Sequence, residues 1–236
     1  MNTRTSLTQS VKSVQIPWQG IMLDGDLTVP DNARGIVLFA HGSGSSRHSP
    51  RNRYVARMLQ RAGFATLLVD LLTREEEEVD ERTRLLRFDI DLLAQRLTGA
   101  TDWVKHQDST RSLAVGYFGA STGAAAALVA AAERPGAVWA VVSRGGRPDL
   151  AGGALPRVHA PTLLIVGGHD FDVIPLNQQA LEQVSSEESR MEIVPNATHL
   201  FEETGALEDV ARFAGDWFTR YLGPEHSPRK VGESVP

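Results

Sequence analysis

The 236-residue chain contains no cysteine, and this absence excludes several classes of function. Thiol catalysis, disulfide frameworks, Cys-ligated zinc sites and iron–sulfur clusters all need cysteine side chains. Basic residues are also outnumbered, with 24 Lys and Arg against 29 Asp and Glu and a formal net charge of −5. Because nucleic-acid phosphates bind basic faces, we expect no nucleic-acid partner.

Long hydrophobic runs are missing as well. No stretch approaches the ~18 consecutive apolar residues of a membrane span, and residues 1–20 contain no apolar core of a signal peptide. We therefore expect a cytoplasmic protein that does not bind a membrane. We predict one domain over residues 1–222, followed by a disordered tail over residues 223–236, which carry three prolines and no apolar pattern.

Short apolar runs without alternation indicate the fold class. Strands buried on both faces are typical of a parallel sheet, and helical spacing between such strands favours βαβ units. The runs cover residues 35–40, 64–69, 113–118, 137–142 and 162–166. We predict an α/β fold, a three-layer α/β/α sandwich of about eight strands and five or six helices, whose first two strands (residues 14–17 and 21–29) are antiparallel.

Two further segments carry helical or charged patterns. Apolar residues recur at helical spacing from Leu86 to Val104 and from Leu207 to Tyr221, which predicts one long helix in each segment. Between residues 75 and 81 the chain is rich in glutamate, and we expect a solvated loop or a first helical turn there.

The motif Gly119-Ala120-Ser121-Thr122-Gly123 carries the clearest chemical signal. It follows an apolar strand directly and opens an alanine-rich helical run, so it has the context of a nucleophile elbow. A turn this tight strains the backbone of Ser121 and lifts its hydroxyl out of the sheet, while glycines on either side avoid clashes. The alternative is that Ser121 is an N-capping serine in a glycine-rich turn.

A serine nucleophile needs a general base and an orienting carboxylate. Of the seven histidines, His199 is the best placed, because it lies in a loop between the last short strand and the last helix. Asp170 follows the strand at residues 162–166 and gives the chain order Ser, Asp, His. Asp172 lies on the same loop and is the rival for the acid.

The oxyanion that forms during acyl transfer needs two N–H donors. One is the backbone N–H of Thr122 at the start of the helix. We assign the other to Ser43, in the glycine-rich loop His41-Gly42-Ser43-Gly44-Ser45-Ser46 that follows the strand at residues 35–40. The alternative is a flexible loop that makes no such contact.

With Ser121, Asp170, His199 and the 41–44 loop at the ends of successive strands, the chain resembles the α/β-hydrolase superfamily from about Val14 to Leu222. Within it, the chain is most similar to the dienelactone hydrolase family. The resemblance implies an eight-stranded sheet with an antiparallel second strand, no cofactor and no metal, and hydrolysis of an ester or lactone through an acyl-enzyme. Typical members use a cysteine nucleophile, which this chain lacks, so a serine esterase fits better than a dienelactone-specific enzyme.

The family's carboxylate-binding arginines match no motif in this chain. Arg47, Arg144 and Arg147 lie on loops at the correct edge of the sheet and are candidate contacts for an anionic group of the substrate. An exposed arginine that contacts only solvent is the alternative for each.

We therefore predict a serine hydrolase that cleaves carboxylic esters, or lactones, of a small-molecule substrate. Residues 143–161 are too few for a helical lid domain, so we expect an open site that favours short acyl groups or substrates reached from outside. Two alternatives stay open. The same three residues could pass the acyl group to an acceptor other than water, as in an acyltransferase or perhydrolase, or the fold could bind a ligand without catalysis.

Overall fold

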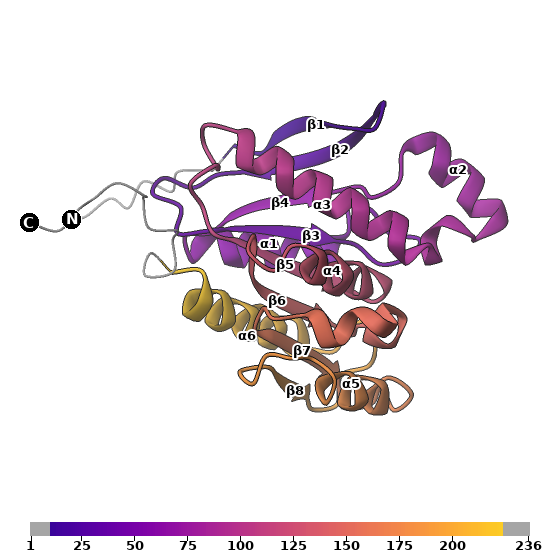
Figure 1. Ribbon diagram of the computed structural model, residues 1–236. Coiled ribbons are helices and arrows are strands. Elements are labelled where there is room, and N and C mark those ends of the chain that lie inside the picture. Colours follow the sequence, from indigo (N-terminus) through magenta and orange to yellow (C-terminus); the bar gives the residue numbers. More distant parts are fainter. Residues whose placement is uncertain (1–9, 224–236) are drawn as a thin grey trace, which may run out of the picture.

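The computed structural model describes residues 10–223. Apart from Gly223, the predicted tail lies outside the described residues. Within them, eight strands form one sheet in the order β1-β2-β4-β3-β5-β6-β7-β8 (Figure 1). The strands are β1 (Lys12–Trp18), β2 (Ile21–Thr28), β3 (Ile36–Ala40), β4 (Ala65–Val69), β5 (Val115–Ala120), β6 (Val138–Arg144), β7 (Thr162–Gly167) and β8 (Arg190–Val194).

The sheet is mostly parallel, as the unalternating apolar runs predict. β2 pairs antiparallel with β1 and with β4, and every other neighbouring pair is parallel. All residues of β3, β4, β5 and β7 are buried, because helices cover both faces of these strands. The predicted three-layer sandwich with an antiparallel second strand is confirmed.

Helices cover both faces of the sheet (Figure 1). α1 and α6 share one apolar core with the sheet, and α3, α4 and α5 share the other. The helical elements are α1 (Pro50–Arg61), α2 (Arg74–Thr83), η1 (Leu86–Phe88), α3 (Ile90–His106), α4 (Thr122–Glu133), η2 (Pro148–Arg157), α5 (Ile174–Leu181) and α6 (Ala206–Tyr221). None of the helices in the described part of the chain is long and apolar enough to span a membrane.

Two helices differ from what the pattern predicts. The long helix predicted to begin at Leu86 is broken, because the side chain of Asp89 accepts a hydrogen bond from the N–H of Leu92 and so caps a separate helix, α3. The glutamate-rich run is helical and not a loop, and Glu75, Glu76 and Glu77 lie in the first turn of its helix. It forms α2, which starts with a capping box in which Thr73 and Glu76 satisfy each other's backbone N–H groups.

The segment between β6 and β7 inserts no lid domain. Its helical element is η2, a short 3₁₀ segment that packs against α4 and α5 on one side of the sheet. The loops that follow β3, β5, β6, β7 and β8 all leave the same edge of the sheet, because these strands are parallel. That edge is therefore where side chains from distant parts of the sequence can meet.

Candidate active site

Ser121 sits at a strained turn between β5 and α4. Its backbone has φ +50° and ψ −121°, a region that non-glycine residues rarely adopt and that costs about 1–3 kcal/mol. A Cβ at Gly119 would overlap α4, and a Cβ at Gly123 would overlap the carbonyl oxygen of Ala40. These two glycines therefore let the helix approach the sheet closely enough to form the turn.

The end of β6 holds this turn through its backbone. The N–H of Ser121 donates to the carbonyl of Arg144 at 3.2 Å, and the carbonyl of Ser121 accepts from the N–H of Arg147 at 3.1 Å. With both of its backbone groups bonded, Ser121 keeps its strained conformation, and its side chain faces a cavity at the sheet edge.

His199 lies between Ser121 and Asp170. Its Nδ1 is 2.7 Å from Oδ2 of Asp170, and its Nε2 is 3.4 Å from Oγ of Ser121. The Asp170 side chain is 11% exposed and that of His199 is 37% exposed, so the imidazole can reach both the partly buried carboxylate and solvent. Asp170 is the only carboxylate hydrogen-bonded to His199 within residues 10–223, and Asp172 is exposed on the same loop.

The loops that carry Asp170 and His199 are tied together by their backbones. The N–H of His169 donates to the carbonyl of Ala197 at 2.9 Å, and the N–H of Gly168 donates to the carbonyl of Val194 at 2.8 Å. A Cβ at Gly167 would overlap the backbone of Ala197, so this close approach of the two loops requires glycine. The acid and the base are thus placed by main-chain contacts.

Ser43 and Thr122 also meet, although they are 79 residues apart in the sequence. As the first residue of α4, Thr122 has a backbone N–H without an acceptor in the preceding turn. The N–H of Ser43 donates to the Thr122 hydroxyl oxygen at 2.9 Å. The two predicted donors are therefore neighbours, and the Ser43 N–H already has an acceptor in this structure.

His41 fixes the loop that carries Ser43. It is buried, its Nδ1 is 3.0 Å from the carbonyl oxygen of Gly42, and its Nε2 accepts from the N–H of Leu71 at 3.1 Å. Burial lowers the pKa of His41, although the Gly42 hydrogen bond and the nearby Asp70 act in the other direction. A neutral imidazole with both nitrogens bonded locks the end of β3 to the loop after β4.

The cavity that contains Ser121 and His199 has a volume of about 260 Å³. Of the three candidate arginines, Arg144 lines it, and its side chain is buried with Nε and Nη1 unpartnered. Arg47 instead lies among the carboxylates of Asp24, Asp26 and Asp70.

Arg147, the third candidate, does not line the cavity either. Its guanidinium is paired with Asp149 by two hydrogen bonds of 2.9 and 2.7 Å. Arg51 at the start of α1 does line the cavity, and we did not predict it. Arg51 follows Pro50, which indicates a helix start soon after the glycine-rich loop. This position is the signal in the sequence that points to Arg51 as a residue of the site.

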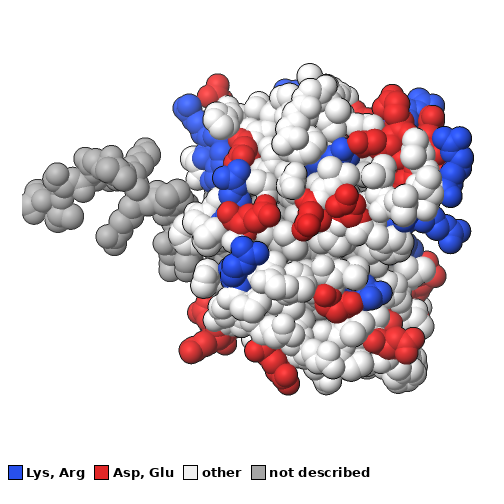
Figure 2. Space-filling view, turned by 45° about the vertical axis from the view of Figure 1, so that its right-hand side comes forward, with Lys and Arg blue, Asp and Glu red and all other residues white. Residues whose placement is uncertain are grey.

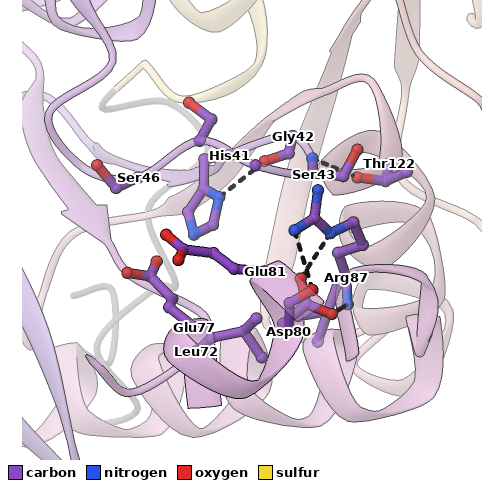
Figure 3. Close-up of a pocket in the computed structure, with 13 residues that line it drawn as sticks. His41, Gly42, Ser43, Ser46, Leu72, Glu77, Asp80, Glu81, Arg87 and Thr122 are labelled. Carbon is purple, nitrogen blue, oxygen red and sulfur yellow. Dashed lines mark hydrogen bonds and ion pairs between the residues drawn. The ribbon is translucent and has the colours of Figure 1, made fainter. Parts of the chain in front are cut away.

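A second cavity of about 210 Å³ lies beside the same glycine-rich loop (Figure 3). Ser43 and Thr122 line it together with Glu77 and Glu81 of α2, and a nearby ion pair joins Arg87 to Asp80 at 2.6 Å. No group of three or more His, Cys, Asp or Glu side chains suited to a metal ion occurs among the described residues. On the face shown in Figure 2, acidic and basic side chains are interspersed.

A mostly parallel eight-stranded sheet with a strained serine turn after β5 is the architecture of an α/β hydrolase. The chain belongs to the dienelactone hydrolase family, whose sequence model matches residues 23–221.

Relatives of known structure have the same fold. A dienelactone hydrolase from Anabaena variabilis is 64% identical, with a TM-score of 0.89, and the match covers 91% of this chain and 99% of that one. An esterase from Pyrococcus furiosus is 18% identical with a TM-score of 0.73, over 91% of this chain and 94% of the other, so its likeness concerns the fold alone.

Among curated proteins, one from Mycobacterium tuberculosis is 60% identical over 214 residues, which are 90% of this chain and 47% of that protein. Its provisional name is phosphoribosyl transferase. The chain thus spans about half the length of the curated relative that it matches.

Proposed function

We propose that the protein is a serine hydrolase that cleaves carboxylic esters, or lactones, through an acyl-enzyme. The observation that carries this proposal is the position of His199, whose two ring nitrogens lie 2.7 Å from Asp170 and 3.4 Å from Ser121. A serine hydroxyl is a poor nucleophile alone and becomes a good one beside an oriented base.

In this mechanism His199 takes the proton of Ser121 as its oxygen attacks the ester carbonyl. Asp170 holds the imidazole in place and stabilises its positive charge. The N–H groups of Thr122 and Ser43 bind the oxyanion. The Ser43 N–H donates to the Thr122 hydroxyl oxygen in this structure, so the oxyanion has to replace that hydroxyl as its acceptor. His199 then returns its proton to the leaving alcohol and activates the water that releases the acid.

The substrate is a short ester or one that reaches the site from outside. The cavity holds about 260 Å³, which suits a small acyl group and not a long lipid chain. Its rim includes His199, which is partly exposed, and Leu200, which is 42% exposed, so the site opens to solvent. As part of this proposal, the partner is a small-molecule ester and the protein is located in the cytoplasm.

We do not propose phosphoribosyl transfer as the activity of this chain. The relative with that name is about twice as long, and the matched segment is 47% of it. The Pyrococcus furiosus protein of the same fold is an esterase, and the serine, histidine and aspartate geometry of this chain supports ester cleavage directly. Transfer of the acyl group to an acceptor other than water, and ligand binding without catalysis, are the alternatives.

The test is hydrolysis of p-nitrophenyl esters of increasing acyl length by the wild type and by Ser121→Ala. We expect turnover of short esters that falls by several orders of magnitude in Ser121→Ala. Competing alcohols, amines or peroxide in the assay separate hydrolysis from acyl transfer by their products. If no ester is cleaved, or if cleavage does not depend on Ser121, the proposal is wrong and a binding function gains support.

A further inference from the structure

We infer that Asn177, on α5, is a positioning residue that holds the loop of Asp170 against the turn that supports Ser121. This inference rests on the proposed function, because it names a residue on which the same catalytic chemistry depends. Asn177 does not line the cavity, and its side chain bonds to none of the three proposed catalytic side chains. Three observations carry the inference: the hydrogen bonds of its amide, the two segments that these bonds join, and an amide oxygen without a partner.

The amide of Asn177 joins two segments that are distant in the sequence. Its Nδ2 donates to the carbonyl oxygen of Gly146 at 3.1 Å, 31 residues earlier in the chain, and to that of Val173 at 2.9 Å, one helical turn earlier. The residue is completely buried. Because the backbone N–H of Asn177 also donates to Val173, the bond to Gly146 is the one that links α5 to the loop after β6.

The first of these segments is the turn that supports Ser121. The carbonyl of Arg144 and the N–H of Arg147 bond to the backbone of Ser121. Gly146 lies between these two residues, and a Cβ at Gly146 would overlap side chains of β6 and of α4. Since the turn is packed on both sides, a shift of the Gly146 carbonyl moves the backbone of the nucleophile with it.

The second segment carries the acid. The N–H of Val173 donates to the carbonyl of Asp170 at 3.0 Å, so the start of α5 is continuous with the acid loop. The base is close to the first segment, because a Cβ at Gly145 would lie 3.1 Å from the carbonyl oxygen of His199. Asn177 therefore joins the segment that carries the acid to the turn that holds the nucleophile and packs against the loop of the base.

The oxygen of the same amide indicates that stability alone does not explain an asparagine here. Oδ1 of Asn177 is buried without a hydrogen-bond partner in the described part of the chain, and such an oxygen costs free energy. A leucine of similar size would remove this unpaired oxygen together with the bond to Gly146, so little net stability should be lost. What the amide provides is a fixed position for the Gly146 carbonyl.

The experiment replaces Asn177 by Leu and measures p-nitrophenyl acetate hydrolysis. We expect kcat to fall about tenfold to a hundredfold, because the loops of the acid and the nucleophile are no longer fixed to each other. KM should stay within about threefold, because Asn177 does not line the cavity.

Two control variants should keep the wild-type kcat. Gln178→Leu makes the same exchange of an amide for an alkyl group one residue farther along α5, where the side chain is exposed. Thr110→Val removes another buried side-chain hydrogen bond, the one from Thr110 to the carbonyl of Val104, before the start of β5 and so at the opposite edge of the sheet.

A double-mutant cycle with Asp170→Asn separates positioning from a general structural loss. If Asn177 aligns the acid with the nucleophile, Asn177→Leu should lower kcat by less than about threefold once the carboxylate is gone. A merely structural effect would lower kcat by the same factor in both backgrounds. The inference is overturned by that equal factor, by a folded Asn177→Leu variant within threefold of wild-type kcat, or by an equal fall in Thr110→Val.

Asn177→Ser is the second variant if Asn177→Leu does not fold. A serine hydroxyl can donate to the carbonyl of Val173 within α5 and is too short to reach Gly146. This variant therefore breaks only the link between the two segments, and we expect the same fall in kcat. A folded Asn177→Ser variant with wild-type kcat also overturns the inference.

The two proposals fail in different ways. If the wild type cleaves esters through Ser121 and Asn177→Leu does so equally fast, the hydrolase stands and the positioning role is wrong. If the wild type cleaves no ester, the proposed function is wrong, and the rate at which a fluorophosphonate labels Ser121 decides on Asn177, because labelling needs an aligned base and no ester. Slower labelling in Asn177→Leu than in Gln178→Leu supports the positioning role, and equal rates, or no labelling of the wild type, remove it.

Discussion

Replacing Asp170 by Asn tests the most specific feature of the site, the contact between a partly buried carboxylate and His199. Asn keeps the shape of the side chain and removes its charge. When His199 takes the proton of Ser121, it becomes an imidazolium whose Nδ1 lies 2.7 Å from Oδ2 of Asp170. Asp170→Asn therefore removes an attraction that exists in the transition state and not in the resting enzyme.

The size of this attraction follows from the geometry. Two unit charges roughly 4 Å apart attract by about 4 kcal/mol at an effective dielectric constant of 20. Because the His199 side chain is 37% exposed, solvent screens part of this, and about 2 to 4 kcal/mol is realistic. Since each 1.36 kcal/mol is tenfold in rate, kcat should fall roughly 30-fold to 1000-fold.

The assay is the initial rate of p-nitrophenyl acetate hydrolysis, with thermal unfolding as a check that each variant is folded. Asp172→Asn is the matched control, because it removes the same charge two residues away on the exposed part of the loop. We expect this control to retain wild-type kcat within about threefold. A folded Asp170→Asn variant that keeps more than a third of kcat, or an Asp172→Asn variant that loses tenfold, would refute the assignment of the acid.

Three further predictions concern the oxyanion site and stability. Ser43→Pro removes the N–H that we assign to the oxyanion and should lower kcat by roughly 10² to 10³. Ser43→Ala keeps the N–H and should retain the wild-type kcat. Equal kcat values in the two variants would place the donor elsewhere. Burial raises the pKa of Glu76, but hydrogen bonds from Arg96 outweigh it and hold the pKa below 4.5, so the ion pair stabilises the fold above that pH and is lost as the pH falls further. In urea unfolding at pH 7, Glu76→Gln should therefore cost about 1–3 kcal/mol and the exposed Glu78→Gln less than about 0.5 kcal/mol, with the difference closing in acid. Burial lowers the pKa of His41 from 6.5, so the folded state resists protonation and its stability falls as the pH drops below about 6.5. Between pH 7.5 and pH 5.5, the free energy of urea unfolding should fall more for the wild type than for His41→Gln. Equal falls in the two proteins would contradict this prediction.

The fold could be predicted from local patterns because each pattern has one physical cause. Strands buried on both faces are apolar throughout, so the runs that became β3, β4, β5 and β7 were visible without alternation. The helix at residues 86–104 was predicted too long, because its apolar spacing continues through η1 and only the capping side chain of Asp89 separates the two elements. The full length of α2 does not follow from its charged sequence, because the contact of Glu76 with Arg96, 20 residues away, cannot be read from local spacing.

Residues of the site that are placed by the backbone could be predicted from the sequence, whereas residues placed by side-chain partners could not. Ser121, Asp170 and His199 follow strands of one sheet, so their meeting at one edge follows from topology, although their catalytic roles stay predictions. The arginines depend on side-chain partners, which are distant in sequence. Arg47 lies 23 residues before its partner Asp70, and nothing local distinguishes it from Arg144, which has no carboxylate partner among the described residues.

At the end of β6, the backbone and the side chains play different roles in the site. The carbonyl of Arg144 and the N–H of Arg147 hold Ser121 in its strained turn, and neither bond involves a side chain. These two bonds do not depend on which side chains positions 144 and 147 carry. Because the Arg144 side chain lines the cavity, a substitution at this position alters the wall of the site without removing the main-chain hydrogen bond that holds the turn.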